Sequence, residues 1–177
     1  MTISLALDTS TSRTTVALLD GEKVLFEEFH EGATDHGRAL SELVAKALKS
    51  GPLPQQVVVG MGPGPFTGLR VGIAFAQTFA LARNIPVIGI CSLDAIVVNQ
   101  TEYIVATDAR RKEIYWARYK DGVRTEGPSV NKPGEVSGFI ADLYPDMRKM
   151  VSLAASQNVR EPFYLRRPDA VPTAERA

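Results

Sequence analysis

Two stretches about a hundred residues apart decide the fold of this chain: ISLALDTSTSRTTVALLDG (residues 3–21) and YIVATDARRKEIYWARYKDG (residues 103–122). Each begins with an apolar run that ends at an aspartate, Asp8 or Asp108, and each closes on an Asp-Gly pair between extended apolar segments. Such a pair is a strong β-hairpin signal, because the favoured two-residue turns need positive φ at their centre. A third extended run follows each hairpin, so one structural unit is written twice.

A strand–hairpin–strand–helix unit that occurs twice is typical of the actin-like and ribonuclease-H-like families, and it predicts a duplicated α/β fold. The elements we expect in the first unit are strands over residues 3–8, 13–19 and 23–29, a helix over 35–49, a strand over 56–61, a helix over 68–83, a strand over 87–90 and a helix over 92–99.

The second unit has room for fewer elements than the first. After three strands that begin at Tyr103, we expect a helix from about Pro133 and one more element over 150–156, so this half is predicted to be truncated. The predicted division is a first subdomain over 1–100, a shortened second subdomain over 101–166 whose residues 150–166 can pack back on the first, and a loose tail over 167–177.

Composition excludes several classes of protein. Lys+Arg and Asp+Glu are both 20, so the formal net charge is zero, whereas a protein that binds nucleic acid by itself carries a basic surplus. The short clusters Arg110-Arg111-Lys112 and Arg166-Arg167 do not change that expectation. One cysteine and a short N-terminal apolar run indicate a cytoplasmic protein without an internal disulfide or a membrane segment.

The glycine-proline loop at residues 62–68 does not have the spacing of a phosphate-binding loop. Gly62 is followed by Gly68-Leu69-Arg70, where a Walker A loop has Gly-Lys-Ser/Thr, and two prolines remove backbone N–H donors. A structural turn is the better interpretation. Asp8 and Thr9, with Asp108, are the candidates for magnesium and nucleotide contacts in an actin-like ATPase; the alternative is that both aspartates cap their turns.

Other catalytic chemistry lacks its residues. The two histidines, His30 and His36, have no metal-ligand spacing, and a single cysteine cannot form a Cys-His cluster. Cys91 and Ser92 follow an apolar strand and have no activating neighbour in the sequence. We therefore expect no metal and no cofactor.

The helix expected over 68–83 carries a stripe of small residues, while apolar residues cover its other faces. A small-residue stripe lets another helix approach closely, and a helix that is apolar all round has more surface than one domain can cover. Together with the apolar stripe of the first helix, this predicts a partner interface formed by Leu40, Leu43, Ala47, Gly68, Val71, Gly72, Phe75, Ala76, Phe79 and Ala80.

Four segments together resemble the TsaB (YeaZ) family: residues 5–11, 62–72, 108–117 and 162–166. The resemblance implies an actin-like, non-catalytic partner of TsaD in the synthesis of threonylcarbamoyladenosine in tRNA. It implies a heterodimer with TsaD, a larger complex with TsaE, a homodimer when the chain is alone, and only indirect contact with tRNA. Where TsaD has two metal-binding histidines, this sequence has Ser92 and Ile96.

Two other functions remain open from the residues. One is an ATP-dependent phosphotransferase or hydrolase that uses Asp8 and Asp108. The other is a glycoprotease-type peptidase, which the missing metal ligands disfavour. The family resemblance favours a scaffold subunit over both enzymes.

Overall fold

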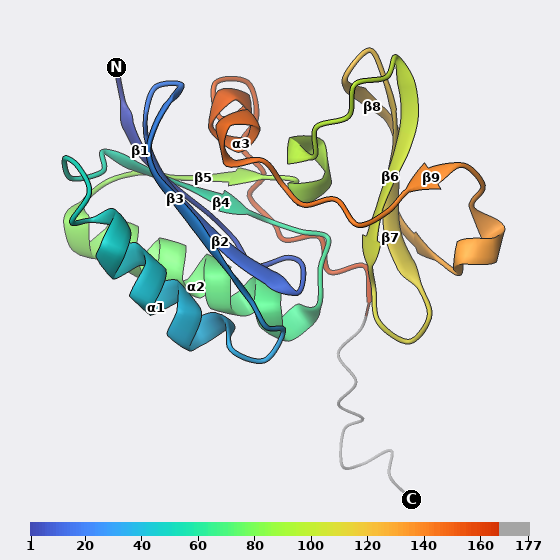
Figure 1. Ribbon diagram of the computed structural model, residues 1–177, viewed down its shortest axis with the longest axis horizontal. Coiled ribbons are helices and arrows are strands. Elements are labelled where there is room, and N and C mark those ends of the chain that lie inside the picture. Colours follow the sequence, from blue (N-terminus) through green and yellow to red (C-terminus); the bar gives the residue numbers. More distant parts are fainter. Residues whose placement is uncertain (167–177) are drawn as a thin grey trace, which may run out of the picture.

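The computed structural model describes residues 1–166 of the chain. Figure 1 shows two sheets side by side, with the helices α1 and α2 below the first sheet and α3 above it. The elements in chain order are β1 (Ile3–Asp8), β2 (Arg13–Asp20), β3 (Lys23–Glu31), α1 (His36–Ala47), β4 (Gln56–Gly60), α2 (Phe66–Arg83), β5 (Val87–Ile90), η1 (Ser92–Ala95), β6 (Glu102–Asp108), β7 (Ile114–Lys120), β8 (Val123–Asn131), η2 (Pro133–Glu135), β9 (Phe139–Ile140) and α3 (Met147–Leu153).

Within the described residues, the two sheets repeat one topology. The first has the strand order β3-β2-β1-β4-β5, with β1 antiparallel to β2 and parallel to β4. The second has the order β8-β7-β6-β9, with β6 antiparallel to β7 and parallel to β9. Each sheet thus contains a three-stranded meander and a parallel strand, β4 or β9, which pairs with the other edge of the first strand of that meander. This confirms the duplicated actin-like α/β fold with a smaller second half.

Both predicted hairpins form, with different turns. In the second hairpin Asp121 and Gly122 occupy the turn with φ of 51° and 75°, as a type I′ turn requires. In the first, Asp20 pairs with Lys23, so the turn consists of Gly21 and Glu22, and only Gly21 has positive φ, at 60°. The Asp-Gly signal located both hairpins, and the pairing register decided which residues turn.

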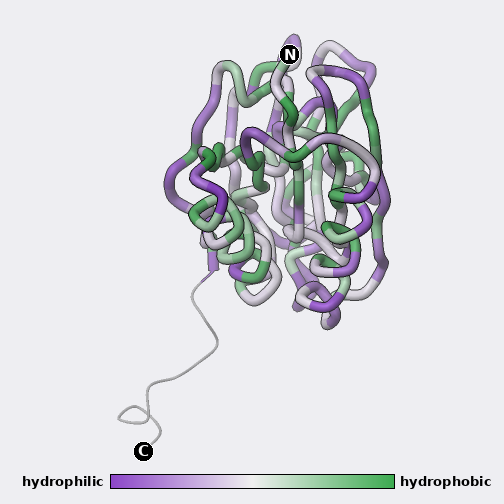
Figure 2. Tube along the Cα trace, turned by 90° about the vertical axis from the view of Figure 1, so that its left-hand side faces the viewer, coloured by the Kyte–Doolittle hydropathy of each residue, from purple (hydrophilic) through white to green (hydrophobic). Residues whose placement is uncertain are grey.

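Helices cover both faces of the first sheet. The apolar sides of α1 and α2 pack with alternate residues of β1, β2 and β4 in the larger core. On the opposite face, Met147 and Met150 of α3 are fully buried against Ala6, Ala17 and Ile90. Hydrophilic stretches run along the outer edges of the chain trace (Figure 2). The last described segment also returns to this half, since Val159 N donates to Gly89 O at 2.7 Å.

Two predicted helices are wrong. Residues 92–99 form only the 3-10 turn η1, because the chain turns extended at Ile96 (φ −75°, ψ 128°), the first of three consecutive β-branched residues. The segment from Pro133 forms the 3-10 turn η2 and then β9. The element expected over 150–156 is α3, which begins earlier because Asp146 caps it by accepting from Lys149 N at 2.8 Å.

No full helix covers the outer face of the second sheet within the described residues. That face carries Ile104, Ala106 and Trp116, and the segment with Val136 and Phe139 packs over it. None of the helices in residues 1–166 is long and apolar enough to cross a membrane. The tail expected over 167–177 lies outside the described residues.

Candidate functional site

Asp8 ends β1 and is 2% exposed. Its Oδ1 accepts hydrogen bonds from Ser10 N at 2.9 Å and from the Ser10 hydroxyl at 2.7 Å, and its Oδ2 accepts one from the Ser92 hydroxyl at 2.6 Å. Burial raises the pKa of the Asp8 carboxyl, and the three hydrogen bonds oppose that rise. Both carboxylate oxygens therefore already have partners within the chain.

Close packing closes the remaining space around this carboxylate. A Cβ at Gly60, the last residue of β4, would overlap Oδ2 of Asp8 and come within 2.6 Å of the Ser92 hydroxyl. The same hydroxyl accepts from Gly62 N at 3.2 Å. The Asp8 side chain thus joins the carboxyl ends of β1, β4 and β5.

Thr9, the second nucleotide-contact candidate, is 1% exposed. Its hydroxyl donates to the Gly68 carbonyl at 2.7 Å and ties the β1–β2 turn to the first turn of α2. The glycine-proline loop packs on the same turn, because a Cβ at Gly64 would overlap the Ser10 carbonyl. The loop is therefore the structural turn predicted from its spacing.

Asp108 has the same turn geometry as Asp8 in a different environment. Its Oδ1 accepts from Arg110 N at 2.9 Å, so both aspartates cap their turns. The Asp108 side chain is 67% exposed, and its Oδ2 lies 3.6 Å from Arg110 Nη1. Asp108 lines a hollow of about 120 Å³ between the two halves, and Asp8 does not. The other residues that line this hollow are Thr11, Ser12, Thr107, Asp142, Leu143 and Tyr144.

Asp8 is therefore not among the residues that line the hollow beside Asp108. Residues 1–166 also hold no group of three or more His, Cys, Asp or Glu side chains placed to bind a metal ion.

The small-residue stripe of α2 faces inward, which corrects its predicted role as a partner seam. Gly68, Gly72, Ala76 and Ala80 are all buried. A Cβ at Gly72 would overlap the Thr9 hydroxyl, and one at Gly68 would lie 2.7 Å from the Thr9 carbonyl oxygen. The stripe therefore lets the β1–β2 turn and the sheet of this chain approach the helix. All three candidates on α1 are buried in the same core: Leu40, Leu43 and Ala47.

The outer side of α2 is the surface that stays accessible. Val71, Phe75 and Phe79 are half-buried, Ala74 is exposed, and Leu81 is 83% exposed. The only charged residues in this 18-residue helix are Arg70 and Arg83. A hollow of about 370 Å³ at its N-terminal end is lined by Phe66, Thr67, Arg70, Val71 and Ala74.

The outer side of α1 is different, because it is charged. Arg38 donates to Asp35 at 2.7 Å and to Glu42 at 3.0 Å, and Lys46 donates to Glu28 at 2.6 Å. Of the two helices predicted to meet a partner, α2 therefore has the apolar accessible face.

Two polar clusters escaped the sequence reasoning, because their members are far apart in the chain. His36 at the start of α1 is 6% exposed, and its Nδ1 lies 2.8 Å from the Thr14 hydroxyl; burial lowers the pKa of this imidazole. Asp94 in η1 accepts from the Tyr119 hydroxyl at 2.8 Å and from Arg124 Nε at 2.9 Å. The second cluster links the connection between the sheets to the second sheet.

Comparison with known proteins gives the family. A family model described as "TsaD: tRNA N6-adenosine threonylcarbamoyltransferase" matches residues 30–171. A protein of Haemophilus influenzae named as a tRNA threonylcarbamoyladenosine biosynthesis protein TsaB is 37% identical over 69% of this chain and 56% of its own length. The Escherichia coli TsaB is 32% identical over 66% of this chain and 54% of its own length. The chain belongs to the TsaB (YeaZ) family.

Solved structures agree with this assignment. YeaZ from Pseudomonas aeruginosa is 25% identical to this chain, and the two superpose with a TM-score of 0.74. The superposition covers 86% of this chain and 91% of the YeaZ chain. A second protein from that organism, described as similar to the peptidase YeaZ, covers 94% of this chain with a TM-score of 0.79. The fold described above is therefore shared with these solved YeaZ-type structures.

The share of each relative that this chain covers differs among the relatives. An uncharacterized protein of Mycobacterium tuberculosis is 40% identical over 96% of this chain and 94% of its own length. The alignment with it spans 200 positions, more than the 177 residues of this chain, so that relative has residues without a counterpart here. The chain spans just over half the length of the two TsaB proteins from Haemophilus influenzae and Escherichia coli.

Proposed function

We propose that this chain is a non-catalytic subunit in the synthesis of threonylcarbamoyladenosine in tRNA. It associates with a TsaD-type transferase through the outer side of α2, joins a larger complex with TsaE, and pairs with a second copy when TsaD is absent. The observation that carries the proposal is the accessible, nearly uncharged side of α2 on the outside of the larger core.

This helix face has the composition of an interface. A surface helix normally alternates an apolar side with a charged one, as α1 does, whereas α2 exposes Ala74, Thr78 and Leu81 and has only two charged residues, Arg70 and Arg83. Exposed apolar surface of this kind is typical of protein–protein contact sites. The hollow beside Phe66 and Val71 offers a place for an apolar side chain of the partner.

The family model supports TsaD as the partner. It bears the TsaD name and matches residues 30–171, a range that includes α1 and α2. A TsaD-type protein therefore has an equivalent helix layer, and two equivalent layers can pack around a pseudo-twofold axis. The same geometry accounts for a homodimer of this chain when TsaD is absent.

Three observations support a role without chemistry. The Asp8 carboxylate is buried, and Ser10 and Ser92 occupy its oxygens. The hollow that Asp108 lines is about 120 Å³, below the roughly 300–1,000 Å³ usual for small-molecule sites. The Cys91 thiol is fully buried, and burial raises its pKa to about 12, so its reactive thiolate is suppressed.

Reconstitution tests the proposal. TsaD, TsaE and the enzyme that forms the threonylcarbamoyl adenylate are combined with tRNA, with and without this chain, and the modified nucleoside is measured by mass spectrometry. We expect product only when the chain is present, because a subunit that binds the competent state of an enzyme raises its population. Equal product in both reactions would refute the proposal. An Asp8→Asn variant, which keeps the side-chain shape, should leave product formation unchanged.

A further inference from the structure

The turn between β6 and β7 holds three consecutive cations in an unfavourable backbone conformation. Arg110, Arg111 and Lys112 all have left-handed φ, at 62°, 53° and 62°. The turn closes through Glu113 N, which donates to the Arg110 carbonyl at 3.0 Å. Glycine or asparagine adopts this conformation at lower cost than a long side chain. Residues held in a sparsely populated region point to a use for their side chains, which here are positive charges at an exposed tip.

Contacts extend this charge across the neighbouring segment. Glu113 forms an ion pair with Arg166. Tyr164, two residues before Arg166, is 41% exposed. The Tyr164 ring contacts the Phe66 ring at a centroid distance of 5.0 Å, and the Arg70 guanidinium lies 5.2 Å from the Phe66 centroid. The resulting surface, called the basic strip below, consists of Arg70, Arg110, Lys112, Arg166, Phe66 and Tyr164.

Cations interleaved with accessible aromatic rings suit one kind of polyanion. Phosphates meet Arg and Lys, while unstacked bases lie on aromatic rings and guanidinium planes, so RNA loops are the ligand class that uses both. The carboxylates of Asp108 and Glu113 neutralise part of the charge, through Arg110 and Arg166. Together with a net charge of zero, this makes the strip a supplementary surface that acts beside a more basic partner.

The strip borders the surface assigned above to the partner. Phe66 and Arg70 line the hollow at the start of α2 and also belong to the strip. We propose that the basic strip contacts the anticodon loop of the tRNA directly, next to the interface with the TsaD-type subunit. This inference rests on the proposed function, and it replaces the expectation that tRNA is met only indirectly.

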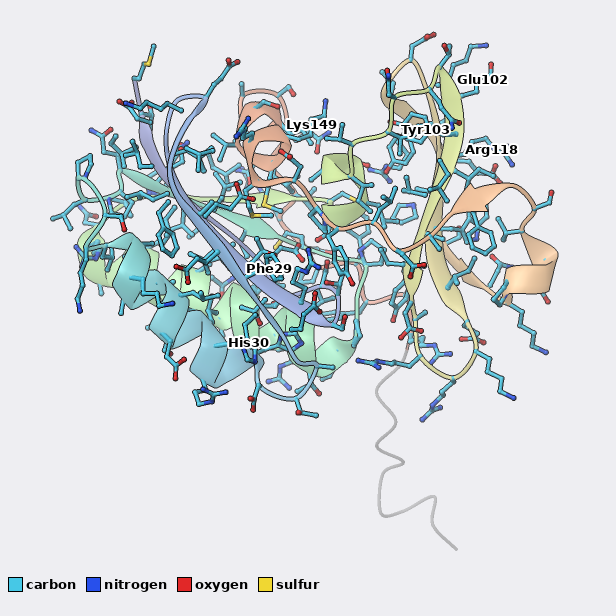
Figure 3. The ribbon with its side chains drawn as sticks, viewed as in Figure 1. Phe29, His30, Glu102, Tyr103, Arg118 and Lys149 are labelled. Atoms are coloured by element: carbon cyan, nitrogen blue, oxygen red, sulfur yellow. The ribbon has the colours of Figure 1, made fainter. Side chains whose placement is uncertain are left out.

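A double variant tests the strip without disturbing the turn. Arg110→Asn with Lys112→Asn removes two charges and supplies a residue type that tolerates positive φ. The control is Lys23→Gln with Lys149→Gln, which removes two charges elsewhere. Figure 3 shows Lys149 on α3, on the upper side of the view, whereas the β6–β7 turn lies on the lower side. Heterodimer formation with TsaD is measured for both by analytical ultracentrifugation, and we expect no change because neither pair lies on α2.

RNA binding is then measured by fluorescence anisotropy, with a labelled anticodon stem-loop and the heterodimer. We expect the tip variant to weaken binding about tenfold and to lower the slope of log K against log salt by roughly 1.4, or about 0.7 for each phosphate contact to a single strand. The control should bind as the unmodified heterodimer does. Product formation should fall with the tip variant and not with the control.

The outcomes separate the two proposals. If the heterodimer forms but the tip variant and the control bind RNA alike, the strip does not contact RNA. If no heterodimer forms, the proposed function fails, and the same comparison with this chain alone decides the fate of the strip. Binding to anionic phospholipid vesicles without binding to RNA would also overturn the inference.

Discussion

The hydroxyl of Ser92 donates to Oδ2 of Asp8 across 2.6 Å, although 84 residues separate them in the chain. The bond joins the end of β1 to the segment that follows β5, at the carboxylate named above as a candidate for magnesium contacts. In this chain that carboxylate is satisfied by two serines and enclosed by Gly60. The Asp8 carboxylate is thus part of the packed interior, and stability measurements can test its contacts with Ser92 and Gly60.

Replacing Ser92 with alanine should destabilise the fold by about 1–3 kcal/mol at pH 7, because Oδ2 of the ionised Asp8 then loses its donor. Burial raises the pKa of Asp8, so the folded protein holds the Asp8 proton more tightly than the unfolded chain does. The resulting gain in unfolding free energy is fully present below pH 3.8, the ordinary pKa of aspartate, and is lost as the pH rises through the folded-state pKa. The loss caused by Ser92→Ala should therefore be smaller near pH 4 than at pH 7. Urea denaturation at both pH values measures it, and an equal loss at both would contradict the ionised state assigned to Asp8.

Asp8→Asn should flatten the dependence of unfolding free energy on pH in the range just above 3.8, because asparagine does not ionise. Its size allows the amide to occupy the same space beside Gly60. A profile that Asp8→Asn leaves unaltered would show that Asp8 does not titrate there.

Gly60→Ala should cost about 3 kcal/mol, because the added methyl group overlaps Oδ2 of Asp8 in a packed interior. In an Asp8→Ala background the same substitution should cost clearly less, because the overlap with the carboxylate is gone and only the close approach to the Ser92 hydroxyl remains. Such a coupling identifies a direct contact between two residues. Chemical denaturation of the four proteins in this cycle measures the coupling, and additive losses would refute the contact.

Ala74→Glu and Ala76→Glu should have opposite effects, because Ala74 is exposed and Ala76 is fully buried. Ala76→Glu should lower the free energy of unfolding by about 3 kcal/mol or more, since it places a carboxylate in the core. Differential scanning calorimetry measures this loss. A stable Ala76→Glu protein would contradict the inward placement of the small-residue stripe.

Ala74→Glu should leave the melting temperature nearly unchanged and weaken association by about 2 kcal/mol or more, because the charge is desolvated in the proposed interface. Ala45→Glu, on the exposed side of α1, is the matched control and should associate as the unmodified chain does. Sedimentation and a TsaD pulldown measure association. Normal association of Ala74→Glu would place the interface elsewhere.

The strands and hairpins were predictable because their signals are local. An Asp-Gly pair between apolar runs restricts φ over a few residues, so both meanders could be located from residues such as Gly21 and Gly122. The helices predicted from Ser92 and Pro133 failed for a different reason. Their short apolar patterns allow more than one conformation, and β-branched residues after Ala95 and the glycines after Pro133 end them within one turn.

The candidate site was predictable in part. Periodicity showed that Gly68, Gly72, Ala76 and Ala80 share one side of a helix, but not what lies against that side. The approach of Thr9 to the first turn of α2 decides this, and it depends on how the β1–β2 turn meets the helix. The interface candidates on the accessible side, such as Val71 and Phe75, stay a prediction.

By itself the sequence determined the duplicated unit, the two capping aspartates and the apolar character of α2, because turn geometry and helical periodicity involve only nearby residues. Tertiary structure alone decided that Asp8 is buried against Ser92 while Asp108 faces solvent. Both aspartates follow apolar runs and pair with the next strand of their hairpin. Beyond that hairpin, β4, β5 and α2 pack around the first, whereas the strand on the other side of β6 is the two-residue β9, which does not reach Asp108. The environment of a carboxylate depends on which elements pack beside it, and no local pattern encodes that.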